Sequence, residues 1–224
     1  MFGQISSKEF ADLSGDEICW LHLSRGRHFT KDHQILSTLQ EAEGTMRHTN
    51  QFNHSKIFAP LLSSFAIWDQ LGSCYADSRR PSYGESQSFK KGLFHFGLQR
   101  SSAGGGRPTA AEIDHLYMLR NGVVHDAAFT SHSRDGTKWY IFRYDESIPT
   151  VVKLPTTPWD GQVSNISAAT TTLVNRDRLV EMTSHGIEIV LDLLTNHRSD
   201  LAVLKNKAEI ITKYLLWLPR QAAV

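Results

Sequence analysis

The chain has 224 residues, 40% of them hydrophobic and 21% charged, a composition typical of one globular domain. The formal net charge of +1 excludes a uniformly basic nucleic-acid coat and an acidic tail. Cys19 and Cys74 match no metal-binding spacing and favour a reducing compartment over a disulfide scaffold. The apolar stretches are too short to span a membrane and no signal peptide is visible, so we expect a cytoplasmic protein without membrane contact.

Hydrophobic periodicity predicts most of the chain as helices. Apolar residues at helical spacing indicate helices at 32–43, 56–76 and 86–99. Ser55 is the expected N-cap of the second helix. Glycine and serine at 101–108 predict a flexible loop. Thr109 and Glu112 then have the spacing of a capping box, which opens a helix over 110–124.

The pattern changes to that of strands after residue 138. Aromatic and β-branched residues at 139–144 and 150–154, separated by turn residues, predict a β-hairpin over about 138–154. Its aromatic residues are expected to alternate between the faces of a hairpin packed on the helices, with base stacking as the alternative: Trp139, Tyr140, Phe142 and Tyr144. Two helices, at 175–196 and 201–218, follow.

The predicted fold is therefore mainly α, a helical bundle with one inserted hairpin. It forms a single domain over 1–224, in which 55–218 is the bundle and 1–54 is a region of uncertain structure.

A cation lies on the apolar face of the helix predicted at 110–124. At 100° per residue, Arg120 falls inside the stripe made by Ile113, Leu116, Leu119 and Val123. A buried guanidinium is costly unless it meets an anion or acceptors, so we expect a structural ion pair or a functional site. On a regular helix His125 projects about 140° away from Arg120. A bend at Gly122 or a second subunit is needed to bring them together.

Residues 119–125, Leu-Arg-Asn-Gly-Val-Val-His, resemble the Arg-x4–6-His signature of HEPN domains in the variant with Asn after the Arg. A helical bundle with earlier helices before the signature is similar to the layout of that family. Residues 66–72 are similar to segments that supply an acidic residue, here Asp69. Other pairs have the same spacing but lack the Asn and the apolar helix face: Arg27–His33, Arg47–His54 and Arg178–His185.

The resemblance implies a metal-independent endoribonuclease, a toxin or phage-defence effector, that needs no cofactor because the 2′-OH of RNA attacks the adjacent phosphorus. His125 would be the general base or acid. Arg120 would hold the phosphate and stabilise the transition state. Asn121 would orient the phosphate or His125, and Asp69 would fix a tautomer or position Arg120. Family members commonly form homodimers with the two signatures facing one cleft.

The resemblance also implies protein partners, either an antitoxin or a nucleotidyltransferase-type enzyme. Some HEPN toxins carry a Tyr two positions after the His, which the nucleotidyltransferase modifies. Ala127 stands there in this chain, which argues against that form of control.

A local excess of positive charge precedes the signature. Six cations stand against Glu85 alone and are candidates for an RNA-binding track, with a solvated surface as the alternative: Arg79, Arg80, Lys90, Lys91, Arg100 and Arg107. Scattered Cys and His residues near the N-terminus have no metal-site spacing, so no metal is expected. The competing function is a non-catalytic HEPN-like module that binds a nucleotide, RNA or a protein, with Arg120 in an ion pair with Asp69 or Asp114.

Overall fold

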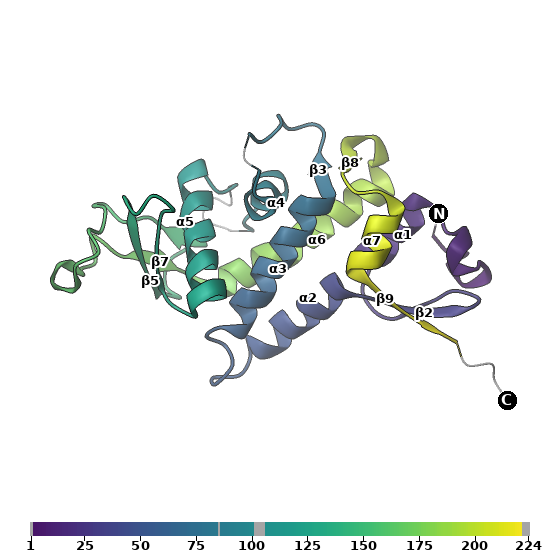
Figure 1. Cartoon of the computed structure of the whole chain (residues 1–224), viewed down its shortest axis with the longest axis horizontal. Helices are drawn as coiled ribbons and strands as arrows, with labels where there is room; N and C mark the ends of the chain where they lie inside the picture. The colour runs from purple at the N-terminus through teal and green to yellow at the C-terminus, as the bar shows by residue number, and fades with distance from the viewer. Residues whose placement is uncertain (1, 85, 101–105, 221–224) are drawn as a thin grey trace.

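The computed structural model describes residues 2–84, 86–100 and 106–220 (Figure 1). Its α-helices are α1 (Gly15–Leu23), α2 (Thr38–Thr49), α3 (Ala59–Cys74), α4 (Ser88–Phe96), α5 (Ala110–Asn121), α6 (Arg176–Asn196) and α7 (Lys207–Tyr214). Its strands are β1 (His28–Phe29), β2 (His33–Ser37), β3 (Tyr75–Asp77), β4 (Thr130–His132), β5 (Trp139–Tyr144), β6 (Val152–Lys153), β7 (Thr172–Val174), β8 (Leu201–Val203) and β9 (Leu215–Pro219). Most of the loop predicted at 101–108 lies outside the described residues.

The protein belongs to the mixed α/β class, with about 49% helix, 15% strand and three small sheets. The expected mainly α fold, a HEPN-like bundle with one hairpin, is therefore wrong. The strands are short, from two residues in β1 to six in β5. Such short strands have little alternation of their own and form because other segments, several of them distant in the sequence, pair with them.

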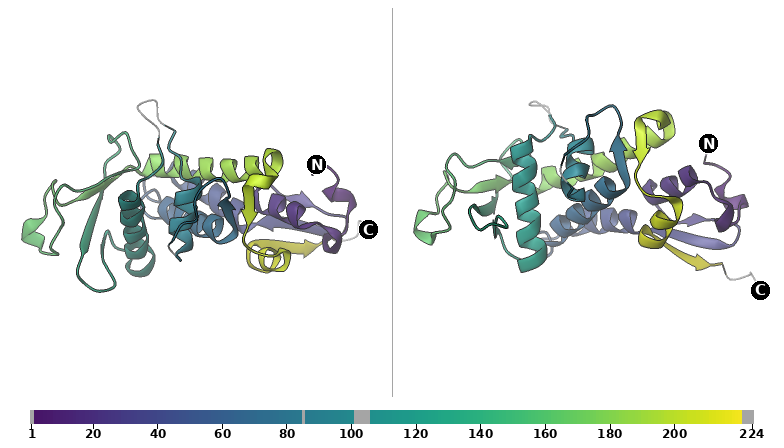
Figure 2. Two further views of the ribbon diagram at one scale, coloured as in Figure 1. Left: turned by 90° about the horizontal axis from the view of Figure 1, so that it is seen from above. Right: turned by 45° about the horizontal axis from the view of Figure 1, so that its top comes forward.

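The middle of the molecule is a group of helices around α3, which contacts α2, α4 and α6 (Figures 1 and 2). Phe65 and Trp68 of α3 are fully buried, and Trp68 Nε1 donates a hydrogen bond to Thr183 Oγ1 of α6 at 2.9 Å. The helices predicted at 56–76, 86–99 and 175–196 are confirmed as α3, α4 and α6. Ser55 is not an N-cap, because α3 begins after Phe58.

Helices α3 and α4 approach each other at two glycines. A Cβ atom on Gly72 would lie 1.9 Å from the backbone oxygen of Ser88. One on Gly92 would lie 2.4 Å from the backbone oxygen of Trp68. The backbones therefore touch where these residues have no side chain, which explains glycine inside two helices despite its cost there.

Two predicted helices are divided between strands and helices. The helix predicted at 32–43 is strand β2 followed by α2, and the helix predicted at 201–218 is β8, α7 and β9. Strand β2 pairs antiparallel with β9, and Ile35 lies opposite Trp217. Strand β3 pairs with β8 in a second small sheet. In each case the strand pairs with a partner that lies far away in the sequence, and Ile35, Leu201 and Leu215 are buried, whereas Leu216, Trp217 and Leu218 of β9 are exposed.

The third sheet lies at the end of the molecule opposite the two termini (Figures 1 and 2). Its strand order is β4-β5-β7-β6, with β5 and β7 parallel. The predicted hairpin between 139–144 and 150–154 is wrong, because β7 lies between β5 and β6 and the antiparallel partner of β5 is β4. The sheet is thereby built from three separate stretches of chain.

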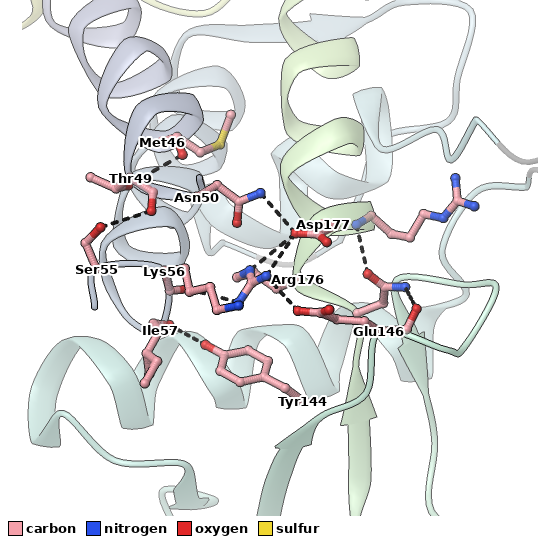
Figure 3. A network of polar contacts seen from close by, with 12 residues as sticks. Met46, Thr49, Asn50, Ser55, Lys56, Ile57, Tyr144, Glu146, Arg176 and Asp177 are labelled. Carbon is pink, nitrogen blue, oxygen red and sulfur yellow. Dashed lines mark hydrogen bonds and ion pairs between the residues drawn. The ribbon is translucent and has the colours of Figure 1, made fainter. Parts of the chain in front are cut away.

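A buried guanidinium joins this sheet to the helices (Figure 3). Arg176, at the start of α6, donates to Glu146 Oε1 at 2.7 Å and to Asp177 Oδ1 at 3.1 Å. It also donates to the backbone oxygen of Lys56 at 3.3 Å. The Tyr144 hydroxyl donates to the backbone oxygen of Ile57 in the same network. These contacts connect the loop after β5 with the loop between α2 and α3.

His22 of α1 is fully buried, with Nδ1 2.8 Å from Tyr75 Oη and Nε2 3.2 Å from Gln70 Oε1. Burial lowers the pKa of His22 to about 4. The unfolded chain therefore takes up a proton here as the pH falls through about 6.5, whereas the folded chain stays neutral down to about 4. Stability present above pH 6.5 is lost progressively within this window.

We expect this loss to be about 3 kcal/mol over the whole window. Urea unfolding of the wild type and His22→Gln at pH 7 and pH 4.5 measures it, and the wild type should lose more stability than the variant. Equal losses in the two proteins would contradict the assignment.

Within the described residues, none of the helices combines the length and the apolar character required to cross a bilayer.

Candidate functional site

The residues singled out around Arg120 lie where α5 changes its winding. Helix α5 begins with the predicted capping box, in which Thr109 Oγ1 accepts from the Glu112 backbone N–H and the Glu112 carboxylate accepts from that of Thr109. After Asn121 the chain continues as one turn of π-helix, η3 (Gly122–Asp126). The turn ends at Ala127, which has a left-handed backbone with φ +50°.

The π-turn brings together the two residues that a regular helix keeps apart. A π-helix joins residues five apart, so His125 returns to the side of the helix that Arg120 occupies. Arg120 Nη1 lies 3.3 Å from His125 Nε2. A guanidinium has only donors, so His125 Nε2 accepts this hydrogen bond. The neutral ring then carries its proton on Nδ1.

Gly122 makes the π-turn fit against the strand that follows. A Cβ atom at this position would lie 2.4 Å from the backbone oxygen of Thr130 and 2.9 Å from that of Ala128. The bend that the sequence suggested at Gly122 is thus a change of helix type rather than the end of the helix.

Two further side chains complete the cluster. Asp69 comes from α3, and its Oδ2 lies 3.1 Å from Arg120 Nη2. Asn121 Oδ1 accepts from Arg120 Nη1 at 3.3 Å. The structure therefore brings all four predicted residues together: Asp69, Arg120, Asn121 and His125. We call these four residues the Arg120 cluster.

The Arg120 cluster is open to solvent on one side. The Arg120 side chain is 23% exposed, that of Asp69 is 34% exposed, and His125 is an exposed residue. Arg120 is thus less buried than its place on the apolar stripe predicts. Its Nε atom is nevertheless buried and has no hydrogen-bond partner among the residues that the structure describes. Asp69 neutralises the charge, and the exposed His125 provides the face that a ligand can reach.

The six cations predicted to bind RNA are mostly engaged with the protein itself. Arg79 Nε pairs with Asp77 Oδ1 at 2.9 Å, and Arg100 Nη2 pairs with Glu188 Oε2 at 2.8 Å. Lys90 has a side chain only 10% exposed. A count of charges over residues 79–107 misses both carboxylates, because Asp77 lies at the end of β3 and Glu188 lies on α6.

The other three cations have different surroundings. The Arg80 guanidinium lies over the Phe94 ring, 4.1 Å from its centroid, and Arg107 Nη1 donates to the backbone oxygen of His95 at 2.8 Å. Lys91 forms no ion pair within the described part of the chain. Of the six cations, Arg79 and Arg100 are thus paired with carboxylates, and Arg80 and Arg107 contact an aromatic ring and a backbone oxygen.

A hollow that the sequence did not single out lies between α5 and the four-stranded sheet. Its volume is about 380 Å³, within the range of small-molecule sites. Its walls include Asp114 and His115 from α5 and the rings of Trp139 and Trp159. The only sequence signal was the run of aromatic residues in β5. We call it the α5–β5 hollow; Arg120 and His125 do not line it.

Among the described residues, no group of three or more His, Cys, Asp or Glu side chains is arranged to hold a metal ion. Comparison with models of protein families, with curated proteins and with solved structures finds no significant match. The similarity to HEPN domains therefore rests on the residues of the Arg120 cluster alone.

Proposed function

We propose that this chain is a metal-independent endoribonuclease whose active site is the Arg120 cluster. The observation that carries the proposal is the contact of 3.3 Å between Arg120 Nη1 and His125 Nε2 across a π-turn, with His125 exposed. A cation that binds a phosphate and an imidazole that transfers a proton are the two groups that cleavage by the 2′-OH requires. The proposal depends on the site and not on the fold.

The reaction needs no nucleophile from the protein. The 2′-oxygen of the substrate forms a bond to phosphorus as it loses its proton, and the bond from phosphorus to the 5′-oxygen breaks as that oxygen gains one. The products are a 2′,3′-cyclic phosphate and a 5′-OH. In the free site the lone pair of His125 Nε2 accepts from Arg120 Nη1; when Nη1 turns to the phosphate, this lone pair is released and accepts the first proton.

The cation of the site acts on the charge of the phosphate. Arg120 donates the second N–H of Nη2 to the phosphate, together with the N–H of Nη1 that leaves His125, and stabilises the charge that grows on the phosphate oxygens. Asp69 holds Nη2 and so aims the guanidinium, while Asn121 limits the motion of Nη1.

A second imidazole is needed to protonate the leaving oxygen. We propose that a second copy of this chain supplies it in a homodimer with the two exposed His125 side chains facing a shared cleft. Exposed apolar side chains support this arrangement, because Leu62 of α3 is 43% exposed and Val124, directly before His125, is 41% exposed. Such side chains favour an interface.

The test is an RNA-degradation assay with purified protein in excess EDTA. The proposal expects cleavage without added metal and products that carry cyclic phosphate ends. Growth arrest on expression, abolished by His125→Ala, is the matching result for a toxin or defence effector in the cytoplasm. If the protein leaves RNA intact, or if the wild type and His125→Ala cleave it equally well, the proposal is wrong.

The ion pair between Arg120 and Asp69 favours a second candidate function. A guanidinium that already has a carboxylate partner can be a structural element of a non-catalytic module that binds a nucleotide, RNA or a protein. This candidate predicts RNA binding without cleavage, and for Arg120→Ala a loss of stability rather than of activity.

A further inference from the structure

The α5–β5 hollow has the features of a ligand site. It is bounded on one side by Asp114 and His115 of α5, and on the other by Trp139, Tyr140 and Trp159. Aromatic rings on one wall and a few polar side chains on the other are the usual lining of pockets for small organic ligands. The hollow therefore suits a flat ligand with an apolar face and polar edges.

The Trp139 ring is partly exposed and is held by its neighbours. It is 41% exposed although it lies in β5, whereas Phe142 of the same strand is buried. Gly161 lies against the indole, because a Cβ atom there would be 3.0 Å from Trp139 Cδ2. The Trp159 ring meets it edge to face, with centroids 6.4 Å apart. A ring held by its neighbours loses little entropy when a ligand stacks on it.

The polar groups of the hollow can form hydrogen bonds with the polar edge of such a ligand. The Asp114 side chain is 51% exposed, and its Oδ1 accepts from Lys90 Nζ at 2.7 Å. The other carboxylate oxygen is an acceptor for ring or exocyclic N–H groups. Lys138 contributes a cation to the lining and forms no ion pair within the described ranges. The acceptor Asp114, the donor Lys138 and the exposed Trp139 indole thus line the same hollow.

A second, more basic hollow adjoins the first. It shares Asp114, Lys138 and Tyr140 with the α5–β5 hollow and adds Arg134 from the turn between β4 and β5. Its volume is about 230 Å³. Asp135 also lines it, but its Oδ1 is occupied by hydrogen bonds from Ser133 and Thr137 within the turn. An anionic group joined to the flat ligand has room there, next to Arg134 and Lys138.

We propose that the α5–β5 hollow binds a nucleotide, with its base stacked on Trp139 and its phosphate directed to Arg134 and Lys138. Either a free mononucleotide or one unit of a single-stranded nucleic acid provides this chemistry. The inference does not depend on the proposed ribonuclease activity, because neither Arg120 nor His125 lines the hollow.

The test uses nucleoside monophosphates and a short single-stranded DNA, which lacks the 2′-OH and so stays intact whether or not the protein is a ribonuclease. Isothermal titration calorimetry measures the affinity in every variant, and quenching of tryptophan fluorescence in the wild type reports base stacking. Similar affinity for monophosphates and DNA indicates a free nucleotide as the ligand, while binding of DNA alone indicates a strand. Both results support nucleotide binding in the α5–β5 hollow.

Three variants locate the binding. Trp139→Ala is expected to weaken it about tenfold or more, since stacking on one aromatic side chain carries an effect of this size. Trp217→Ala is the matched control, because Trp217 is 47% exposed on β9, outside the hollow, and its replacement should leave affinity unchanged. Ala111→Leu on α5 should also weaken binding about tenfold by filling the hollow, while leucine keeps the helix stable.

Circular dichroism checks that each variant is folded. The proposal is overturned if no probe binds saturably, or if either Trp139→Ala or Ala111→Leu binds as tightly as the wild type.

Discussion

Replacing His125 with alanine is expected to lower the rate of RNA cleavage by about 10²–10⁴-fold, because the variant has no group at this position to accept the 2′-OH proton. His125 is exposed, so the free energy of unfolding should stay within about 0.5 kcal/mol of the wild type. The rates are measured on a fluorescent RNA in excess EDTA, and stability by urea unfolding.

A matched control is available on the neighbouring strand. His132 of β4 is also exposed and is not part of the Arg120 cluster, so His132→Ala should cleave at the wild-type rate. Arg120→Lys should lose about 10²-fold or more, since a lysine keeps the charge but not the two-pronged donor geometry. An equal loss in His132→Ala and His125→Ala would refute the assignment of the base.

Replacing Gly72 with alanine is expected to destabilise the protein by about 3 kcal/mol or more. The added Cβ would lie 1.9 Å from the backbone oxygen of Ser88, so α3 and α4 have to move apart. Their separation opens the core around the buried Phe65 and Phe89 rings, which contact each other with centroids 5.6 Å apart. The change in urea midpoint and in thermal unfolding measures the effect.

Gly44→Ala is the control for the substitution itself. Gly44 lies in the middle of α2, and a Cβ atom there would have nothing within 4 Å, so alanine should raise stability by about 0.5–1 kcal/mol. Opposite signs for the two glycines are the expected result. Two stabilising changes would contradict the close approach of α3 and α4.

The sequence predicted those parts of the fold that depend on neighbours in the chain. The capping box at Thr109 and Glu112 and the long amphipathic helix α6 are local patterns, and both are present. The division of 201–218 into two strands and a helix is not local, because β8 needs β3 and β9 needs β2. The spacing of Leu and Ile in this segment does not distinguish a helix from a strand that pairs with a distant partner.

The candidate site also has features that local sequence patterns predicted and features that depend on long-range contacts. Arg120 and His125 were identified from their spacing and from a cation on an apolar stripe, and the structure brings them together. The π-turn that joins them has no sequence signal apart from Gly122. The ion pair between Arg100 and Glu188 also has no signal in the sequence, because the two residues meet only after α6 packs. The exposure of Trp139 depends on which strands flank β5. The alternation of residues along β5 does not determine those neighbours.

The pairing of β2 with β9 has a consequence for how the chain is made. Residues 33–37 leave the ribosome before their partner at 215–219, which emerges only after more than 170 further residues have been translated. During that time the apolar Ile35 and Leu36 lack their final neighbours. This sheet therefore cannot form until residues 215–219 have been made, and loop closure over such a separation is slow. A nascent chain that stops before residue 215 leaves this edge open to aggregation or to a chaperone.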